Sequence, residues 1–530
     1  MALLLDVQDL AVSFVTRMGT NKAVDGISFN VKTGQITAII GESGSGKSVA
    51  CYSMLGLIPM PPGRIDGGRA LFEGRDLLQL SEAELREIRG RDVAMIFQDP
   101  MTCLNPFMTV GKQLMEPLLY HKKVSKREAR QRALALLEEV GIRDPESTID
   151  NFPHQFSGGM RQRVMIAMAL INEPKLLIAD EPTTALDVSI QAQILKLIAE
   201  LQTKHDIGII FISHDLAVVA DIADQIVVMQ QGAIVEAGDR EAIFHHAEHP
   251  YTRKLLAAIP ADSKQTEPGT PQPLIRVQNL CTWFEQGRGV APVKAVNDVS
   301  FDINRGEVLG LVGESGSGKS TIGRSILRLV PVTSGHVTFD GTDVTGLQGR
   351  DLKNMRRRMQ MIFQDPFASL NPRMTVFDTL AEPLLLHGIE TRKTVNQGVL
   401  QLMDDVGLAR AFVRKYPHEF SGGQRQRIAI GRALATRPEF IVADEPVSAL
   451  DVTIQAQILD LMQELGREYG LTMLFISHDL AVVRHLADRI LVLYKGQVVE
   501  QGSGDDLFER PQQAYTRQLL QSIPGRSLLT

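Results

Sequence analysis

The chain has 530 residues, of which 44% are hydrophobic and 22% charged, with a formal net charge of −6 at pH 7. This length exceeds what one hydrophobic core usually holds, so we expect at least two globular domains. The acidic balance argues against nucleic acid as a partner, and three cysteines are too few for a disulfide framework.

No apolar run approaches the about 18 residues of a membrane span. The initial MALLLDVQDL lacks the basic region of a signal peptide, so we expect a chain that does not itself span a membrane.

Most of the sequence is one module that occurs twice. GESGSGKS stands at 41–48 and 313–320, ADEP at 179–182 and 443–446, and ISHDLAVV at 212–219 and 476–483. The motifs follow the same order in both copies, which indicates a duplicated domain rather than a short-period solenoid. We therefore predict one domain over residues 1–260 and a second over 274–530, joined by a Pro-rich linker at 261–273.

Within each copy, short apolar runs alternate with helical patterns, which predicts an α/β fold with a parallel sheet covered by helices. The strand-like runs at 36–40 and 308–312 lead directly into the Gly-rich loops. A helix is expected after each loop, and we expect Pro59 and Pro331 to end these two helices.

Both loops fit the pattern G-x-x-x-x-G-K-[ST] of a phosphate-binding P-loop. Glycines let backbone N–H groups converge on phosphate oxygens, and the following helix N-terminus favours an anion. Lys47 and Lys319 should reach the β- and γ-phosphates, and the hydroxyls of Ser48 and Ser320 should ligate Mg²⁺. The predicted nucleotide-binding residues of the two loops are Gly41, Ser43, Gly44, Gly46, Lys47, Ser48, Val49, Gly313, Ser315, Gly316, Gly318, Lys319, Ser320 and Thr321.

Gln98 and Gln364, in the two FQDP motifs, are candidate contacts to Mg²⁺ or to the attacking water. Between Gln98 and residue 157 the pattern becomes helical, which predicts a helical insert in the first domain. Ser125 and Glu128 have the spacing of a capping box, an apolar face follows, and Gly141 can end the helix.

QFSGGMRQR at 155–163 and EFSGGQRQR at 419–427 place a Ser and two glycines before a helical pattern. The arrangement predicts a second anion-binding helix terminus, although a helix cap without a ligand has the same pattern. A domain with one nucleotide has no need of two such termini on its own phosphates. The loop would therefore serve a nucleotide that is held elsewhere.

The apolar strands LLIADE (176–181) and FIVADE (440–445) end in paired carboxylates. Asp180 and Asp444 are placed to hold the Mg²⁺ shell, and Glu181 and Glu445 to act as general bases on water. An acidic pair after a strand can also simply favour a helix N-terminus.

A histidine follows another apolar strand in each copy. His214 and His478 are candidate γ-phosphate contacts, although such a histidine can also be a cap or an interior residue.

The order P-loop, FQDP glutamine, SGG loop, acidic strand end, ALD and SHD resembles that of ATP-binding-cassette ATPases over essentially the whole chain. The resemblance implies two tandem P-loop NTPase ABC nucleotide-binding domains, each with a RecA-like core, an antiparallel β subdomain and a helical subdomain. It also implies that two cassettes act head to tail, each SGG loop closing on ATP held by the other P-loop. Ser421, Gly422 and Gly423 would then cover ATP at Lys47, and Ser157, Gly158 and Gly159 would cover ATP at Lys319.

The same resemblance assigns Phe14 and Phe284 to stacking on adenine, and Asp187 and Asp451 to coupling the two sites. Met160 departs from the usual Gln. Because the Ser and both glycines of that loop are present, we expect both sites to hydrolyse ATP with Mg²⁺.

Finer features resemble dipeptide and oligopeptide importer ATPases, among them QDPMTCLNPFMTV (98–110), HPYTRKLLAAIP (249–260) and AYTRQLLQSIP (514–524). Their fusion in one chain is similar to the ATPase of Yej-type bacterial peptide importers. This resemblance implies ATP hydrolysis coupled to two integral-membrane permease subunits and a periplasmic or extracellular peptide-binding protein. One monomer would supply both cassettes, peripheral to the cytoplasmic face of the bacterial inner membrane.

Other functions stay open. The same architecture could import glutathione, nickel chelates or another small solute, because the cargo is chosen by other subunits. A soluble ribosome-associated tandem ABC ATPase is a second alternative, although such proteins usually have a long charged helical linker. An exporter would not account for the importer features of both cassettes.

Overall fold

The computed structural model describes residues 2–16, 19–98, 103–183, 186–258, 272–287, 289–448 and 450–525. Two compact units form: nearly all of β1 (Leu3–Thr16) through α11 (Pro250–Ala257), and nearly all of β11 (Pro273–Phe284) through α21 (Ala514–Gln521). The domain boundaries at 260 and 274 stay predictions. Residues 261–271 of the predicted linker lie outside the described residues, and β11 already begins at Pro273.

The first unit begins with an antiparallel sheet in the order β2-β1-β4-β5. Its other strands are β2 (Gly19–Lys32), β4 (Gly63–Phe72) and β5 (Arg75–Asp76). The central strand β1 sets Val7 opposite Phe29 on one side and Ala70 on the other. These side chains are buried, so one face of this sheet packs on the core.

A six-stranded sheet in the order β10-β9-β3-β8-β7-β6 forms the centre of the first unit. Its strands are β3 (Ile36–Ile40), β6 (Val93–Ile96), β7 (Leu176–Asp180), β8 (Gly208–Ser213), β9 (Gln225–Gln230) and β10 (Ala233–Asp239). All neighbours are parallel except β9 and β10. Ile39 packs into the core shared with β1, whereas Ala38 and Ile40 pack into a second core. All five residues of the strand are buried, and all but Thr37 are apolar, because both faces of the sheet are covered.

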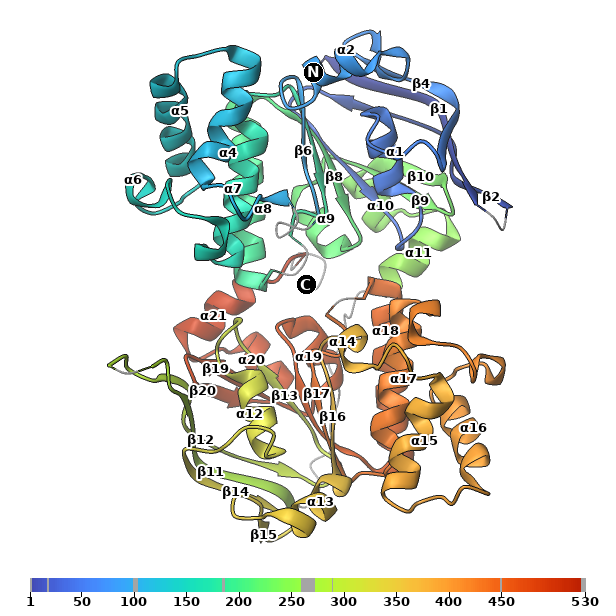
Figure 1. The fold of residues 1–530 in the computed structure, drawn as a ribbon, viewed down its shortest axis with the longest axis vertical. Helices are drawn as coiled ribbons and strands as arrows, with labels where there is room; N and C mark the ends of the chain where they lie inside the picture. The colour runs from blue at the N-terminus through green and yellow to red at the C-terminus, as the bar shows by residue number, and fades with distance from the viewer. Residues whose placement is uncertain are drawn as a thin grey trace. The chain divides into compact units, whose positions relative to one another are not determined.

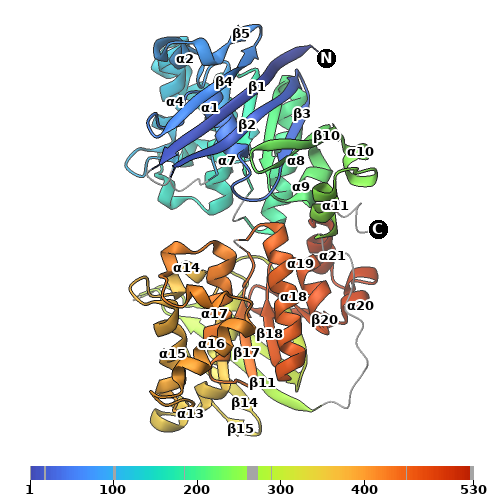
Figure 2. The same cartoon turned by 90° about the vertical axis from the view of Figure 1, so that its right-hand side faces the viewer.

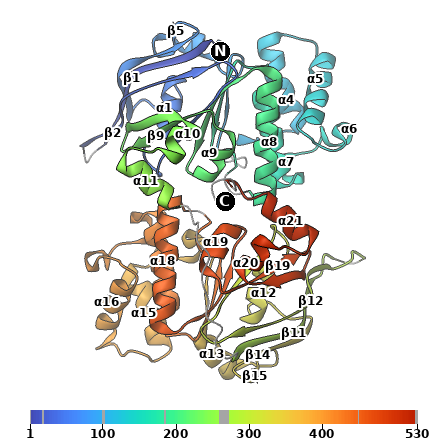
Figure 3. The same cartoon turned by 180° about the vertical axis from the view of Figure 1, so that it is seen from behind.

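The helices of the first unit are α1 (Lys47–Met54), α2 (Glu82–Ile88), α4 (Val110–Pro117), α5 (Lys126–Glu139), α6 (Pro145–Thr148), α7 (Gly158–Leu170), α8 (Val188–His205), α9 (Leu216–Ile222), α10 (Arg240–His245) and α11. In Figure 1, α4, α5 and α7 gather beside the six-stranded sheet, away from β1 and β4. The view from behind shows the same helical group next to α8 (Figure 3).

The second unit repeats this architecture, with sheet orders β12-β11-β14-β15 and β16-β17-β18-β13-β19-β20. Its further strands are β12 (Val293–Asn304), β13 (Val308–Val312), β14 (Ser334–Phe339), β15 (Thr342–Asp343), β16 (Met359–Ile362), β17 (Phe440–Asp444), β18 (Thr472–Ile476), β19 (Arg489–Tyr494) and β20 (Gln497–Gly502). Its helices are α12 (Lys319–Ile326), α13 (Gly349–Arg358), α14 (Pro366–Ser369), α15 (Val376–Leu386), α16 (Val395–Asp405), α17 (Gly422–Leu434), α18 (Val452–Tyr469), α19 (Leu480–Leu486), α20 (Gly504–Glu509) and α21. Figure 2 shows α15, α16 and α17 grouped beside its sheet.

The predicted strands at 36–40 and 308–312 are confirmed as β3 and β13, but the prediction for the next helices is partly wrong. Both end before the prolines, α1 at Met54 and α12 at Ile326. After α1, Gly56 takes a φ of 60° and the N–H of Leu57 returns to the carbonyl of Tyr52 at 2.8 Å. This left-handed C-terminal turn ends the helix before Pro59 is reached.

The predicted helical insert is confirmed as α4 to α6. Ser125 caps α5 by accepting the N–H of Glu128 at 3.2 Å, and Gly141 follows the helix with a φ of 77°. The Glu128 carboxylate pairs with Arg132 at 2.8 Å, so the cap is made by the serine, with Glu128 as an i,i+4 partner. Among the described residues, no helix is both long enough and apolar enough to cross a bilayer.

Candidate active site

The first P-loop joins the carboxyl end of β3 to the N-terminus of α1. Gly41 and Gly46 have φ values of 149° and 99°, and a side chain at either would collide with a backbone carbonyl, that of Met229 or of Ala23. Only glycine fits both the conformation and the space. Gly313 and Gly318 repeat this geometry between β13 and α12. Each loop therefore presents backbone rather than side chains to a ligand, at a helix N-terminus.

The P-loop lysines are buried and folded against their own loops. Lys47 Nζ donates to the carbonyls of Gly41 at 2.7 Å and Glu42 at 2.9 Å. Lys319 Nζ makes the same pair of bonds, to Gly313 at 2.7 Å and Glu314 at 2.9 Å. Burial lowers the pKa of Lys319, and nearby carboxylates offset part of this effect. The ammonium group is thereby held at the loop where a phosphate would bind.

A hydroxyl and a carboxylate lie next to each P-loop. Ser48 Oγ donates to Asp180 Oδ1 at 2.9 Å, and Ser320 Oγ donates to Asp444 Oδ1 at 2.7 Å. Burial raises the pKa of both carboxyl groups, against the hydrogen bonds that favour their charged forms. Hydroxyl and carboxylate oxygens are the hard ligands that Mg²⁺ prefers, so the donor set fits this ion.

The glutamate that follows β7 or β17 contacts a glutamine and a histidine. Gln98 Nε2 donates to Glu181 Oε2 at 2.8 Å, and His214 Nδ1 lies 3.0 Å from Glu181 Oε1. In the second unit, Gln364 Nε2 donates to Glu445 Oε2 at 2.9 Å, and His478 Nδ1 lies 3.1 Å from the same oxygen. The structure thus brings together three predicted residues in each unit.

The two glutamates have unusual backbone geometry. Their φ values are 47° for Glu181 and 46° for Glu445, a region that non-glycine residues seldom occupy. The N–H of Glu181 donates to Ile212 at 3.0 Å and that of Glu445 to Ile476 at 2.9 Å, which holds each turn against the neighbouring strand. Strain of this kind typically accompanies functional side chains.

Burial and the neighbouring charge shift the pKa values of the glutamate–histidine pairs in opposite directions. Burial lowers the pKa of His214 and His478, but the neighbouring carboxylates outweigh it, so both pKa values lie above the usual range. Burial raises the pKa of Glu445, but its hydrogen bond from His478 outweighs this, so its pKa lies below the usual range. The carboxylate is therefore kept charged and able to accept a proton.

Each SGG loop begins a helix. Ser157 Oγ accepts the N–H of Met160 at the start of α7, and Ser421 Oγ accepts that of Gln424 at the start of α17, both at 3.4 Å. The Gln424 side chain also accepts the N–H of Ser421 at 3.2 Å, which methionine has no oxygen to do. The substitution therefore removes one side of a capping box while leaving the serine cap in place.

The second glycine of each SGG loop packs closely against the following helix. A side chain at Gly159 would meet Ile190 of α8, and one at Gly423 would meet Ile454 of α18, whereas Gly158 has open space around it. Asp451 caps α18 by accepting the N–H of Ile454 at 3.1 Å, while Asp187 directly precedes α8. What the SGG loops bind stays a prediction.

The two predicted adenine-stacking residues have different surroundings. Phe14, on β1, is partly buried and packs against the core that β1 shares with Ile39, whereas Phe284 ends β11 with 41% of its surface exposed. Next to it, Trp283 is 37% exposed and lies under Lys294, whose Nζ is 4.6 Å from the ring centroid. The adenine assignments therefore stay predictions.

Sequence reasoning missed two residues that face the metal-site aspartates. Tyr52 donates its hydroxyl to Asp180 Oδ2 at 2.8 Å, and Arg324 lies 3.8 Å from Asp444 Oδ2. Each stands four residues after the P-loop serine, hence on the same helix face. That spacing was the available signal, but the identities differ between copies, so comparing the repeats did not reveal it.

Two known families match both cassettes of the chain. Residues 24–184 and 296–448, more than half of the chain, match the family described as ABC transporter. Residues 235–285 and 499–526 match the oligopeptide/dipeptide transporter C-terminal region.

Relatives match almost the whole chain. The glutathione import ATP-binding protein GsiA of Pectobacterium atrosepticum is 48% identical, with 98% of this chain and 89% of that protein covered. The protein of the same name from Escherichia coli K12 is 47% identical with the same coverage. A solved dimeric ATP-binding cassette in a post-hydrolysis state, bound to ADP and Pi, is 31% identical over 43% of this chain and 98% of that chain, with a TM-score of 0.40. The chain belongs to the ABC transporter family, as an ATPase with two ATP-binding cassettes.

Proposed function

We propose that this ATPase drives the import of peptides, including small peptides such as glutathione, through a separate membrane permease. The observation that carries the proposal is that each cassette ends in a match to the oligopeptide/dipeptide transporter C-terminal region. The glutathione import relatives, at 47–48% identity, support import and a peptide-class cargo. A nickel chelate remains an outcome that a transport assay would reveal.

The chemistry follows from the residues around each P-loop. The backbone N–H groups and Lys47 or Lys319 bind the phosphates of ATP. Ser48 with Asp180, and Ser320 with Asp444, would hold Mg²⁺, with Gln98 and Gln364 as further candidate ligands. When bound, this ion would neutralise charge on the phosphate oxygens.

The catalytic glutamates act on water. Glu181 and Glu445 accept its proton as general bases, while Gln98 and Gln364 orient the glutamate and the water. His214 and His478 hold their glutamates in place and remain candidates for contact with the γ-phosphate. Because these contacts recur in both cassettes within about 0.1 Å, we infer that both cassettes hydrolyse ATP.

We further propose that each SGG loop acts on the ATP of the other cassette. Ser157, Gly158 and Gly159 would serve the ATP at Lys319, and Ser421, Gly422 and Gly423 the ATP at Lys47. This assignment is supported by the family pattern and by the intact serine cap on both loops. It would make hydrolysis depend on both cassettes together.

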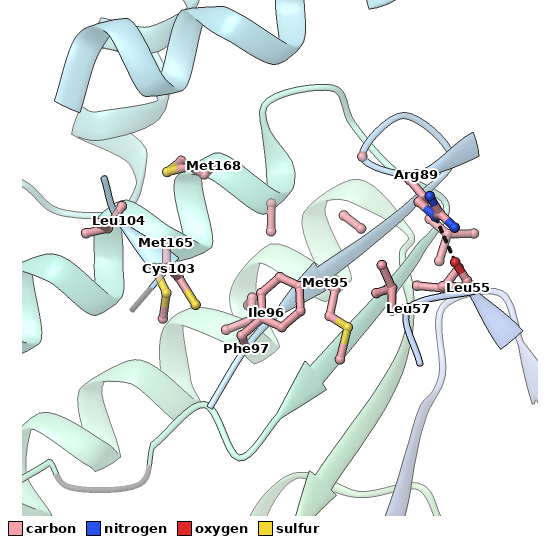
Figure 4. A pocket seen from close by; sticks show the side chains of 14 residues that line it. Leu55, Leu57, Arg89, Met95, Ile96, Phe97, Cys103, Leu104, Met165 and Met168 are labelled. Carbon is pink, nitrogen blue, oxygen red and sulfur yellow. Dashed lines mark hydrogen bonds between the residues drawn. The ribbon is translucent and has the colours of Figure 1, made fainter. Parts of the chain in front are cut away.

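An apolar cavity supports contact of the first cassette with a permease subunit. The cavity, about 340 Å³, is lined by Leu57, Met95, Phe97, Leu104 and Met168, among others (Figure 4). Phe97 directly precedes Gln98 and its ring lies 6.2 Å, edge to face, from that of Tyr52. A hydrophobic side chain of a permease loop would fit this cavity, next to the residues that contact Glu181 and Asp180. The partners we propose are two integral-membrane subunits and a peptide-binding protein, with this chain peripheral to the cytoplasmic face of the inner membrane.

Co-purification tests the partners. A tagged Glu181→Gln/Glu445→Gln chain, held in ATP, would be isolated from detergent-solubilised membranes. We expect two multi-span subunits to be recovered in equal amounts. Recovery of ribosomes or nucleic acid without a permease would contradict the proposal.

A further inference from the structure

The C-terminal region of each cassette contacts the P-loop of the same cassette through a tyrosine. The hydroxyl of Tyr251, on α11, accepts the backbone N–H of Glu42 at 3.0 Å. The hydroxyl of Tyr515, on α21, accepts the N–H of Glu314 at 3.1 Å. Glu42 and Glu314 are the second residues of the two P-loops, so the same contact occurs independently in both cassettes.

The tyrosines are held firmly at the start of their helices. On the first cassette, the Glu236 carboxylate of β10 accepts the N–H groups of Glu248 at 2.7 Å and His249 at 3.2 Å. His249 Nδ1 then caps α11 by accepting the N–H of Tyr251 at 3.2 Å, and the tyrosine is only 5% exposed. The hydroxyl is thus a fixed acceptor rather than a mobile one.

The second cassette has the same carboxylate anchor, without a side-chain cap on α21. The Glu500 carboxylate of β20 accepts the N–H groups of Gln512 at 2.6 Å and Gln513 at 3.0 Å. The ring of Tyr515 packs on that of Tyr494, with 4.3 Å between centroids. A carboxylate on the last strand therefore anchors each helix start, and each helix anchors a P-loop.

The peptide group whose N–H donates to the tyrosine also accepts a hydrogen bond from the P-loop lysine through its carbonyl. The N–H of Glu42 and the carbonyl of Gly41 belong to one planar peptide unit. Tyr251 accepts from the N–H side of this unit, while Lys47 Nζ donates to its carbonyl at 2.7 Å. Because the unit is rigid, fixing the direction of the N–H fixes the carbonyl that orients the lysine.

The lysine of the second cassette is tied in the same way. Tyr515 holds the N–H of Glu314, and Lys319 Nζ donates to the carbonyl of Gly313 at 2.7 Å. A Gly at the first position allows this peptide unit many orientations in the absence of a restraint. The tyrosine supplies that restraint from outside the loop.

We propose that Tyr251 and Tyr515 are positioning residues for ATP binding, and that the peptide-transporter C-terminal region of each cassette sets its ATP affinity through them. The proposal rests on the assignment of the P-loops as ATP sites. It does not depend on the identity of the cargo. It gives the C-terminal region a role in nucleotide binding within its own cassette.

Nucleotide binding by the full chain is the test. The Tyr251→Phe/Tyr515→Phe variant keeps both rings and removes only the two hydroxyls. We expect its dissociation constant for a fluorescent ATP analogue to rise about three- to tenfold, because in each loop a partly buried N–H loses its acceptor. Tyr494→Phe removes a hydroxyl from the ring beside Tyr515 without touching the P-loop, and should leave the constant unchanged.

The possible outcomes test the positioning role and the ATP sites separately. An unchanged dissociation constant in the double variant, or an equal rise in Tyr494→Phe, would overturn the positioning role. A lowered melting temperature with unchanged affinity would mean that the hydroxyls only secure the C-terminal helices. Failure of the wild-type chain itself to bind the analogue would instead contradict the proposed function.

Hydrogen exchange on the wild-type chain provides a second measurement that needs no variant. Coupling between two sites is reciprocal, so ATP should slow amide exchange in α11 and α21 as well as in the P-loops. Exchange in both helices that is the same with and without ATP would contradict the proposal.

Discussion

The hydroxyl of Tyr52 donates a 2.8 Å hydrogen bond to Oδ2 of Asp180, the carboxylate proposed to hold Mg²⁺ in the first cassette. The corresponding oxygen of Asp444 has no hydrogen-bond partner among the described residues, and Arg324 lies 3.8 Å away. The glutamate, glutamine and histidine proposed to act on water contact one another in both cassettes. The two sites therefore differ in what secures the metal-site aspartate.

Tyr52→Phe should weaken the first cassette. The substitution keeps the ring and leaves a buried carboxylate oxygen without its donor, which costs about 1–3 kcal/mol in free energy of unfolding. Urea denaturation of the full chain would measure the loss. Tyr120→Phe is the matched control, because that ring is 51% exposed, and it should change stability by less than about 0.5 kcal/mol. Equal effects of the two substitutions would show that the Asp180 contact has no energetic role.

Glu181→Gln and Glu445→Gln should each trap ATP and lower its turnover by about a hundredfold or more, since each removes a general base and hydrolysis is proposed to depend on both cassettes together. Steady-state hydrolysis and the amount of ATP retained after gel filtration would measure the two effects. Glu128→Gln, on the exposed side of α5, is the control and should hydrolyse ATP normally. Unchanged turnover in either active-site variant would contradict hydrolysis at both sites.

Met160→Gln should stabilise the start of α7 without changing ATP turnover. Gln would supply the acceptor that Gln424 offers to the N–H of Ser421 in the second cassette, a gain of about 0.5–1 kcal/mol. The melting temperature and the hydrolysis rate would be measured together, with Gln424→Met as the reciprocal change. A several-fold rise in turnover by Met160→Gln would show instead that the native methionine impairs this loop.

The Glu445–His478 pair should make stability depend on pH in a defined window. The pKa of His478 is raised above its ordinary value of 6.5, so its contribution is complete below that value and is lost as pH rises through the folded pKa. The pKa of Glu445 is lowered below 4.5, so its contribution is present above that value and is lost as pH falls through the folded pKa. The pair is therefore most stabilising between about pH 4.5 and 6.5.

His478→Gln should accordingly destabilise the chain more at pH 6 than at pH 9. Urea denaturation at both values would measure the difference, and Lys319 and Asp479, which also act on this histidine, are unchanged in the comparison. A loss that grows with pH would contradict the raised pKa of His478.

Many residues of this site could be predicted because they belong to short local motifs. Lys47, Ser48, Asp180 and Glu181 each follow a strand or begin a helix, and strand order in a parallel sheet brings such positions to one edge. Gln98 was predicted as a contact to Mg²⁺ or water and His214 as a γ-phosphate contact, and the structure places both against Glu181. Their contacts with Mg²⁺, water and phosphate stay predictions.

What could not be predicted depends on contacts between distant segments. Tyr251 lies 209 residues from Glu42, and no spacing rule links a late helix to the P-loop. The end of α1 was wrongly predicted at Pro59, because a left-handed turn at Gly56 competes with the proline as a helix stop. The Tyr52 contact was missed because Arg324 replaces the tyrosine in the second copy.

Uptake into proteoliposomes tests the central claim most directly. Vesicles holding this chain with its co-purified permease subunits and peptide-binding protein, with ATP on the cassette side, would be given labelled dipeptide, oligopeptide and glutathione. We predict ATP-dependent uptake of at least one of these peptides, and its loss with Glu181→Gln/Glu445→Gln. ATP hydrolysis without uptake of any of the three, while another solute accumulates, would contradict peptide import.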